Sequence, residues 1–346
     1  MPPIRSYAMN NPTQRPILSV ENLTTEFRIS GQWHPAIRDL SFHVLPNETL
    51  AIVGESGCGK SITALSIMQL INKSQGRIAH GRIEFDGRDL TACSEREMEA
   101  VRGDALAMIF QEPMTSLNPV MTIGFQIAEA VRYHRPVSKR EANKRALELL
   151  ELVKIPSAAR RFDDYPHQFS GGMRQRVMIA MALACEPKLL LADEPTTALD
   201  VTIQVQILAL LADLKETKQM GMVFITHNLG VVASIADRVA VMYGGRIIEE
   251  ADVVSLFEHP THPYTEALLK SMPRVDQPRT ALHPIAGQVP PITVDMPGCR
   301  YAERCPLREA RCDVSVPPLT PVAGATGHRV RCWVRAPSPM LEAVAS

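Results

Sequence analysis

Short apolar segments recur along the chain, and most of them have the length and composition of a buried β-strand. They occupy residues 17–20, 24–29, 37–44, 50–53, 82–85, 107–110, 188–192, 221–226 and 239–243. Asp86-Gly87 and Gly244-Gly245 follow two of these segments and favour tight hairpin turns, the second leading into residues 246–250. The pattern predicts an α/β fold in which short antiparallel strands flank a core of buried strands.

Between residues 114 and 186 the apolar positions follow helical spacing instead. Ser138 and Glu141 have the spacing of a capping box, and the apolar residues behind them recur with a helical period: Ala142, Ala146, Leu149, Leu150 and Val153. We therefore expect a helical insert, residues 114–186, within a main domain that spans residues 16–255. Residues 1–15, rich in Pro and Asn, predict a disordered tail. Residues 256–346 predict an irregular extension, because proline is frequent and apolar runs are few after Met272.

The segment 50–53 leads into a glycine-rich loop that fits the phosphate-binding pattern G-x-x-x-x-G-K-S/T at every fixed position. The loop consists of Gly54, Glu55, Ser56, Gly57, Cys58, Gly59, Lys60 and Ser61, and Ile62 begins a helix predicted over residues 62–70. Its glycines let backbone N–H groups face phosphate, and the helix adds its positive N-terminal end. Lys60 is expected to reach the β- and γ-phosphates and Ser61 to help hold Mg²⁺. The loop therefore predicts binding of a nucleoside triphosphate.

Two further strands end in residues suited to triphosphate hydrolysis. After segment 188–192, Asp193 is expected to hold Mg²⁺ and Glu194 to act as general base toward the attacking water. Segment 221–226 delivers His227 to the same carboxyl edge of the sheet, where it can contact the γ-phosphate and orient Glu194. Together with the phosphate loop, these residues predict a P-loop NTPase core of the RecA-like type.

An aromatic residue upstream of the loop is a candidate for stacking on the nucleotide base. Phe27, in segment 24–29, can present a flat face to a purine, and Trp33 is the substitute. A single aromatic residue in a strand suits the hydrophobic core equally well, so both interpretations stay open.

Composition limits the classes of partner. The 37 Lys and Arg residues equal the 37 Asp and Glu residues, which argues against nucleic acid as the main partner. The longest uninterrupted apolar run covers residues 177–185 and is far shorter than the ~20 residues that span a membrane. Seven cysteines in a long chain without an export signal favour a reducing compartment. We therefore expect a soluble cytosolic protein that meets a membrane only through a partner.

The motifs occur in the order typical of one family. Over residues 17–250 the chain resembles the ATP-binding cassette (ABC) ATPases of transporters. The motifs that carry the resemblance occur in this order: phosphate loop, Gln111, Ser170-Gly171-Gly172, Asp193-Glu194, Asp200 and His227. The resemblance implies that Ser170, Gly171 and Gly172 form the signature motif, which caps the γ-phosphate of ATP across a head-to-tail dimer. It also implies that Gln111 senses the nucleotide and its Mg²⁺, and that the loop after it touches a membrane subunit. Phe169, Met173 and Asn228 depart from the usual pattern beside intact functional positions.

One branch of that family is still more similar. Residues 165–177, 193–202 and 262–269 look like the ATP-binding subunits of dipeptide and oligopeptide importers. The resemblance implies an ATP-driven motor at the cytoplasmic face of the cell membrane. Its partners would be two permease subunits, a second ATPase subunit that is commonly a paralogue, and an extracytoplasmic substrate-binding protein. An importer for nickel or another metal chelate is the alternative, and a soluble ABC ATPase of DNA repair or translation is a reading from another class.

Four of the seven cysteines lie in the extension: Cys299, Cys305, Cys312 and Cys332. Four thiolates can hold Zn²⁺ or an iron–sulfur cluster, although the C-x-x-C pair usual for structural zinc is missing. The resemblance implies a 4Fe–4S cluster, because some peptide-importer ATPases bind one through four tail cysteines at similar spacing; zinc and free thiols are the alternatives. Outside this group, Cys58 in the phosphate loop could make the ATPase sensitive to oxidants.

Overall fold

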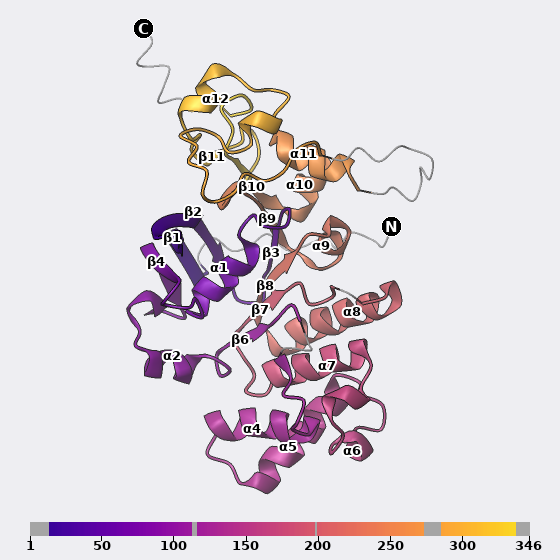
Figure 1. Cartoon of the computed structure of the whole chain (residues 1–346). Helices are drawn as coiled ribbons and strands as arrows, with labels where there is room; N and C mark the ends of the chain where they lie inside the picture. Colours follow the sequence, from indigo (N-terminus) through magenta and orange to yellow (C-terminus); the bar gives the residue numbers. More distant parts are fainter. Residues whose placement is uncertain (1–13, 113–115, 198, 273–284, 337–346) are drawn as a thin grey trace.

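A mainly parallel sheet of eight strands runs through the middle of the molecule (Figure 1). The computed structural model describes residues 14–112, 116–197, 199–272 and 285–336, so most of the predicted tail lies outside the described residues. In spatial order the strands are β11 (Thr320–Pro321), β12 (Arg329–Val330), β10 (Arg246–Asp252), β9 (Arg238–Tyr243), β3 (Thr49–Val53), β8 (Gly221–Thr226), β7 (Leu189–Asp193) and β6 (Leu106–Ile109). The five from β9 to β6 are parallel, and the other three pair antiparallel.

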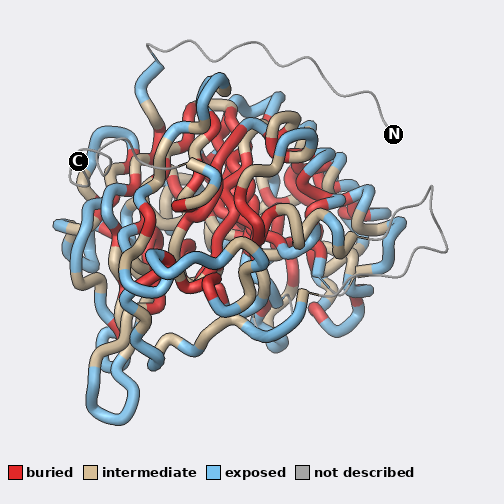
Figure 2. The backbone as a smooth tube through the Cα atoms, turned by 90° about the horizontal axis from the view of Figure 1, so that it is seen from above, coloured by how far each residue is buried: buried red, intermediate tan, exposed pale blue. Residues whose placement is uncertain are grey.

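The parallel strands are apolar because both faces of the sheet are covered. Every residue of β3, β7 and β8 is buried. Figure 2 shows the buried parts of the chain gathered in the centre of the molecule, with exposed segments around them. The continuous apolar runs in the sequence therefore correspond to the central strands, whose carboxyl ends meet at one edge.

A second sheet of four antiparallel strands lies beside the first. Its order is β2 (Gln32–Val44), β1 (Leu18–Ile29), β4 (Gly76–Phe85) and β5 (Arg88–Asp89). The two segments predicted at 17–20 and 24–29 form one strand, β1, because register shifts around Asn22 (φ 50°) let it continue past the polar residues. The hairpin predicted at Asp86-Gly87 is confirmed, with positive φ at both turn residues.

Helices cover the main sheet and form a separate lobe at its β6 end. Those around the sheet are α1 (Lys60–Ile67), η1 (Leu90–Ala92), α2 (Glu95–Val101), α8 (Val201–Lys218), α9 (Leu229–Ile235), α10 (Val253–Glu258) and α11 (Pro263–Lys270). The lobe contains α4 (Ile123–His134), α5 (Lys139–Leu152), α6 (Ala158–Arg161), η2 (Pro166–Gln168) and α7 (Gly171–Ala182), and no strand occurs among its described residues, 116–186. The capping box that Ser138 and Glu141 predict is present at the start of α5. A single apolar core joins α4, α5 and α7 to β6, β7 and β8.

The C-terminal extension joins the main sheet. It contains η3 (Ala302–Arg304), α12 (Ala310–Val314) and the two short strands β11 and β12, and Glu249 and Glu250 of β10 pair with Val330 and Arg329 of β12. The sequence did not predict these strands, because each has only two residues. The extension's own apolar cluster is small, with Ala302, Cys312 and Trp333 at its centre. Its order therefore depends on the main sheet.

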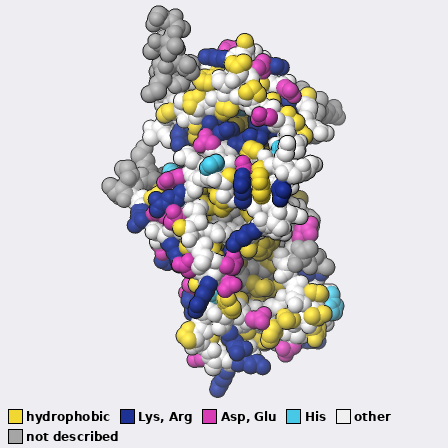
Figure 3. All heavy atoms as spheres, turned by 60° about the vertical axis from the view of Figure 1, so that its left-hand side comes forward, with side chains coloured by type: hydrophobic (Ala, Val, Ile, Leu, Met, Phe, Trp, Pro, Cys, Tyr) yellow, Lys and Arg dark blue, Asp and Glu magenta, His cyan; other side chains and the backbone are white. Residues whose placement is uncertain are grey.

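The surface carries both signs of charge. On the face shown in Figure 3, Lys and Arg side chains lie among Asp and Glu side chains. Across the part of the chain that the structure describes, no helix combines the length and apolar character of a membrane span.

Candidate functional site

The glycine-rich loop connects β3 to α1 and is held against the turn after β9. At Gly59 φ is +108°, a conformation that favours glycine. A Cβ at Gly54 would lie 2.2 Å from the carbonyl oxygen of Met242, so a larger residue would force the loop away from the sheet. Ser56 and Gly57 are exposed at the tip of the loop, where an anion can approach backbone N–H groups.

Lys60 lies inside the curve of this loop. Its side chain is buried, and its ammonium group donates to the carbonyl oxygens of Gly54 (2.8 Å) and Glu55 (3.0 Å). The loop therefore places a positive charge among its own backbone groups at the start of α1. Ile62, two residues further along α1, packs against the apolar core and anchors the helix.

Ser61 and Asp193 join the phosphate loop to the end of β7. The Ser61 hydroxyl donates to Oδ1 of Asp193 over 3.0 Å. Burial raises the pKa of Asp193, because a carboxylate loses hydration there. Carboxylate and hydroxyl oxygens are the protein ligands that Mg²⁺ prefers, and a cation at this place would favour the ionised form of Asp193. The donor set therefore fits a magnesium ion.

Glu194 receives hydrogen bonds from three directions. Its Oε2 accepts from Nε2 of Gln111 (3.3 Å) and from the hydroxyl of Thr197 (2.8 Å), while Oε1 lies 3.1 Å from Nδ1 of His227. Partial burial acts to raise the pKa of Glu194, but the hydrogen bonds from His227 and Thr197 outweigh it and the pKa is lowered. Glu194 is therefore an ionised carboxylate at neutral pH.

Thr197 is a member of this group that sequence reasoning missed. Its backbone N–H donates to the Glu194 carbonyl (3.1 Å) while its hydroxyl reaches the carboxylate. A Thr three residues after the acid is the signal that could have found it, because side-chain and backbone bonds at this spacing close one turn. The strand ends of β6, β7 and β8 thus bring Gln111, Glu194 and His227 together, as their parallel order requires.

The Ser-Gly-Gly segment lies elsewhere in the molecule. Ser170 caps α7, accepting the N–H of Met173 at 3.4 Å, and Asp200 caps α8 in the same way through Ile203 (2.9 Å). Gly172 packs so tightly on α8 that a Cβ there would lie 2.6 Å from Cγ2 of Ile203. Figure 1 shows α7 well apart from α1, so the segment and the phosphate loop of one chain do not form one site.

The two aromatic candidates for base stacking lie in the antiparallel sheet. Phe27 in β1 is half-buried and packs on the backbone of Gly76, where a Cβ would approach its ring to 3.0 Å. Trp33 in β2 has the guanidinium of Arg77 over its ring at 4.3 Å. One face of Trp33 is thus occupied, and stacking by Phe27 stays a prediction.

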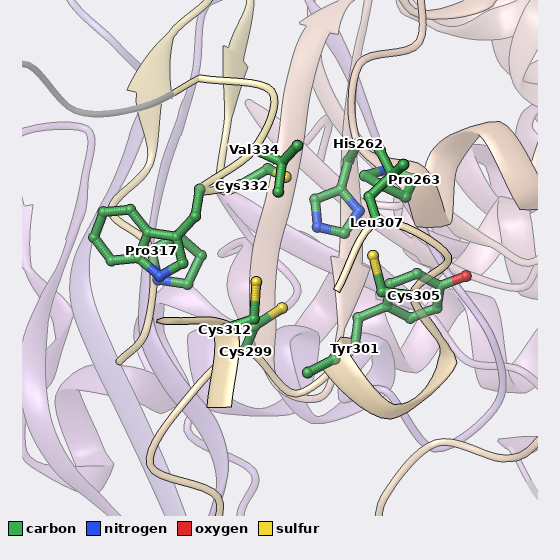
Figure 4. A pocket seen from close by; sticks show the side chains of 12 residues that line it. His262, Pro263, Cys299, Tyr301, Cys305, Leu307, Cys312, Pro317, Cys332 and Val334 are labelled. Carbon is green, nitrogen blue, oxygen red and sulfur yellow. The ribbon is translucent and has the colours of Figure 1, made fainter. Parts of the chain in front are cut away.

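The four extension cysteines line one small pocket (Figure 4). Cys299, Cys305, Cys312 and Cys332 border it together with His262, Tyr301 and Trp333. Burial and the neighbouring thiols raise the pKa of Cys299 to about 11, so its sulfur is a thiol unless a cation binds. Within the described ranges, no three His, Cys, Asp or Glu side chains are arranged to hold a single metal ion.

Cys58 is a residue of the phosphate loop whose side chain is buried and does not reach the surface. The residue is fully buried, and burial raises the pKa of its thiol. Because the thiolate is the form that oxidants attack, the structure argues against the oxidant sensitivity expected from its place in the loop.

Fold and site together define a P-loop nucleoside triphosphatase, with its phosphate loop, buried Asp193 and ionised Glu194 at the carboxyl edge of a parallel sheet. A family model described as ABC transporter matches residues 37–197, and one described as Oligopeptide/dipeptide transporter, C-terminal region, matches residues 248–312. The chain belongs to the ABC transporter family, among the ATP-binding subunits of peptide transporters. Its activity is ATP hydrolysis coupled to transport.

Individual proteins give the same result. Over 325 residues the chain is 52% identical to a Sinorhizobium fredii protein named Probable peptide ABC transporter ATP-binding protein, covering 94% of this chain and 96% of that one. The Dipeptide transport ATP-binding protein DppD of Bacillus subtilis is 49% identical over 319 residues, 92% of this chain and 95% of that one. A solved dimeric ATP-binding cassette in a post-hydrolysis state, bound to ADP and Pi, has a TM-score of 0.62 at 28% identity, covering 68% of this chain and 98% of that chain.

Proposed function

We propose that this chain powers the import of dipeptides or oligopeptides by hydrolysing ATP at the site described above. The observation that carries the proposal is the hydrogen-bonded Glu194, a carboxylate held ionised beside the Ser61–Asp193 pair. The match of residues 248–312 to the C-terminal region of oligopeptide/dipeptide transporters supports peptide as the cargo.

In the proposed mechanism each residue has a separate role. Lys60 and the loop N–H groups bind the phosphates, and Ser61, Asp193 and Gln111 hold Mg²⁺, which when bound offsets charge on the phosphates. Glu194 accepts a proton as a water oxygen bonds to the γ-phosphorus, and the bond from that phosphorus to the β–γ bridging oxygen breaks, leaving ADP and phosphate. His227 orients Glu194 from the far side and contacts the γ-phosphate.

The signature segment is proposed to act on a second subunit. Ser170, Gly171 and Gly172 lie on the helical lobe at the N-terminus of a 12-residue helix, whose positive end suits a γ-phosphate. The distance from the chain's own loop favours a head-to-tail dimer in which each site is completed by the other subunit, and the relative bound to ADP and Pi is dimeric. We propose a paralogous chain as the second subunit, and Asp200, next to the segment, lies at the same interface.

The permease partners are proposed to meet the helical lobe. Val120 is 78% exposed and Phe125 is 43% exposed at the start of this lobe, close in sequence to the loop that follows Gln111. Large exposed apolar side chains of this kind are typical of surfaces that bind another protein. Docking there, with two permeases and an extracytoplasmic binding protein in the same complex, would hold the ATPase at the cytoplasmic face of the membrane.

We propose that the cysteine pocket holds a 4Fe–4S cluster. Four cysteines line one pocket, and four cysteine thiolates are the usual ligand set of such a cluster. Iron and acid-labile sulfide measured on anaerobically purified protein test this. Cys312→Ser should lose both, and Cys93→Ser, outside the pocket, should keep both. Zinc in place of iron, or neither element, would contradict the proposal.

Transport by the purified complex tests the main proposal. Vesicles containing the complex are offered labelled dipeptide and labelled nickel chelate in parallel, with ATP inside or outside and with Glu194→Gln as the inactive control. We expect ATP-dependent dipeptide uptake that the variant abolishes. Uptake of the nickel chelate alone would overturn the cargo, and equal uptake with the variant would overturn the catalytic role of Glu194.

A further inference from the structure

The extension contacts the phosphate loop through the ion pair between Arg304 and Glu55. Nη1 and Nη2 of Arg304 each lie 3.1 Å from a different carboxylate oxygen of Glu55, the second residue of the loop. The Arg304 side chain is 6% exposed and that of Glu55 is 27% exposed, so the pair is largely shielded from water. Two parallel bonds of this kind fix both direction and distance, unlike a single surface ion pair.

A second contact holds the backbone of the same residue. The hydroxyl of Tyr264, in α11, accepts the backbone N–H of Glu55 over 2.9 Å. Tyr264 is fully buried, and burial raises the pKa of its hydroxyl, which therefore stays neutral. Glu55 is thus held at its side chain by η3 and at its backbone by α11, both of which follow the ATP-binding core in sequence.

The groups behind this contact are closely packed. Tyr243, Tyr264 and Tyr301 pack edge to face, with ring centroids 4.7 to 5.3 Å apart. The guanidinium of Arg304 lies over two of these rings, at 5.6 Å from Tyr243 and 5.8 Å from Tyr301. It also donates to the Tyr243 hydroxyl (3.2 Å) and, through Nε, to the Ala286 carbonyl (2.8 Å). These contacts orient the Arg304 guanidinium toward Glu55.

The position of Glu55 matters for phosphate because its carbonyl oxygen accepts from Lys60 (3.0 Å) and from the N–H of Cys58 (3.3 Å). Moving Glu55 would displace the lysine and the turn at the tip of the loop. An unpaired Glu55 carboxylate would also repel the triphosphate, and the guanidinium offsets that charge. We propose that Arg304 is a positioning residue for the phosphate loop, through which the C-terminal extension sets the affinity of the site for ATP.

This inference rests on the proposed binding of ATP at the loop, and its test separates the two. The full-length chain in its purified transporter complex is titrated with the non-hydrolysable analogue AMP-PNP and Mg²⁺, and its ATPase rate is measured against ATP concentration. We expect Arg304→Ala to raise both the AMP-PNP Kd and the KM for ATP about tenfold, in line with the loss of a charge-assisted bidentate contact. The kcat at saturating ATP should stay within about twofold, because Arg304 does not touch the reacting atoms.

Arg304→Lys keeps the positive charge but loses the paired N–H donors of the guanidinium, and we expect the Kd and the KM to rise only about threefold. The matched control is Arg308→Ala, which removes an exposed arginine of the same extension that pairs with Asp313 instead of the loop. It should leave Kd and KM unchanged. A wild-type complex that binds no AMP-PNP would overturn the proposed function itself, whatever the variants do.

A double-mutant cycle with Glu55→Ala distinguishes positioning from a merely structural role. If Arg304 acts through Glu55, Arg304→Ala should change Kd less than twofold in the Glu55→Ala background. A tenfold effect in both backgrounds would overturn the inference, as would an Arg304→Ala variant that loses thermal stability with unchanged Kd and KM. If Arg304→Ala does not fold, Tyr264→Phe is used instead, because it removes only the hydroxyl that holds the Glu55 N–H. An unchanged KM in that variant would also contradict the inference.

Discussion

Replacing Glu194 with Gln tests the chemical step most directly. The substitution keeps the size and shape of the side chain and removes its charge. The amide oxygen can still accept from Gln111 and Thr197, which both donate to one oxygen of the carboxylate. The amide nitrogen would then face Nδ1 of His227, which accepts a hydrogen bond in its other tautomer. The three contacts can therefore survive, and we expect the free energy of unfolding to change by less than about 1 kcal/mol.

The effect on catalysis should be large. A positioned general base typically contributes 10²- to 10⁴-fold, so we expect kcat to fall by about that factor, roughly 2.7–5.5 kcal/mol in activation free energy. ATP binding should persist or tighten, because the variant removes a negative charge from the neighbourhood of the phosphates. We therefore expect the substitution to lower kcat and not to raise the KM for ATP.

Phosphate release at saturating ATP and equilibrium binding of labelled ATP are the two assays. Glu148→Gln serves as the control, since Glu148 is 49% exposed on α5 and belongs to the helical lobe. Turnover within about threefold of wild type, in a variant that binds ATP normally, would refute the assignment of Glu194 as base and with it the reasoning from its three hydrogen bonds.

Three further predictions concern pH, packing and the extension. The pKa of Glu194 is lowered, so its contacts stabilise the folded state above the ordinary glutamate pKa, and this stabilisation is lost as the pH falls through the lowered pKa of the folded state. Because Glu194 is ionised near neutrality, kcat should show no loss from this residue between pH 6 and 8. A titration of kcat near neutrality that Glu194→Asp shifts would contradict this. Gly172→Ala should cost about 1 kcal/mol in unfolding free energy, because its Cβ would lie 2.6 Å from Ile203. Gly171→Ala should cost nothing, because its Cβ would lie 3.9 Å from Leu199. Equal melting temperatures for the two variants would contradict this prediction. His328→Ala should cost about 1–3 kcal/mol in unfolding free energy, because it removes a 2.8 Å hydrogen-bond partner of the buried Glu249 carboxylate. Arg329→Ala should cost less than about 1 kcal/mol, because Arg238 still pairs with Glu250 over 3.1 Å. Similar denaturation midpoints for the two variants would contradict this prediction.

Local sequence determined most of the core elements and the places of the candidate site residues. The uninterrupted apolar runs predicted buried parallel strands, because a strand covered on both faces needs apolar residues at every position. Glycines at fixed spacing predicted the loop around Lys60, and Asp193, Glu194 and His227 were placed at strand ends whose parallel order brings them to one edge. Each of these inferences uses information within about ten residues of chain, and the structure places all four residues at that edge.

Contacts between distant segments were decided only in the tertiary structure. The Arg304–Glu55 pair joins residues 249 positions apart, and β12 reaches β10 from a segment that has no strand pattern of its own. Two-residue strands and single ion pairs leave no periodic signal in the sequence, since neither repeats along the chain. The extension takes its place because β10 offers an open strand edge and Glu55 a carboxylate, and both exist only once the core has folded.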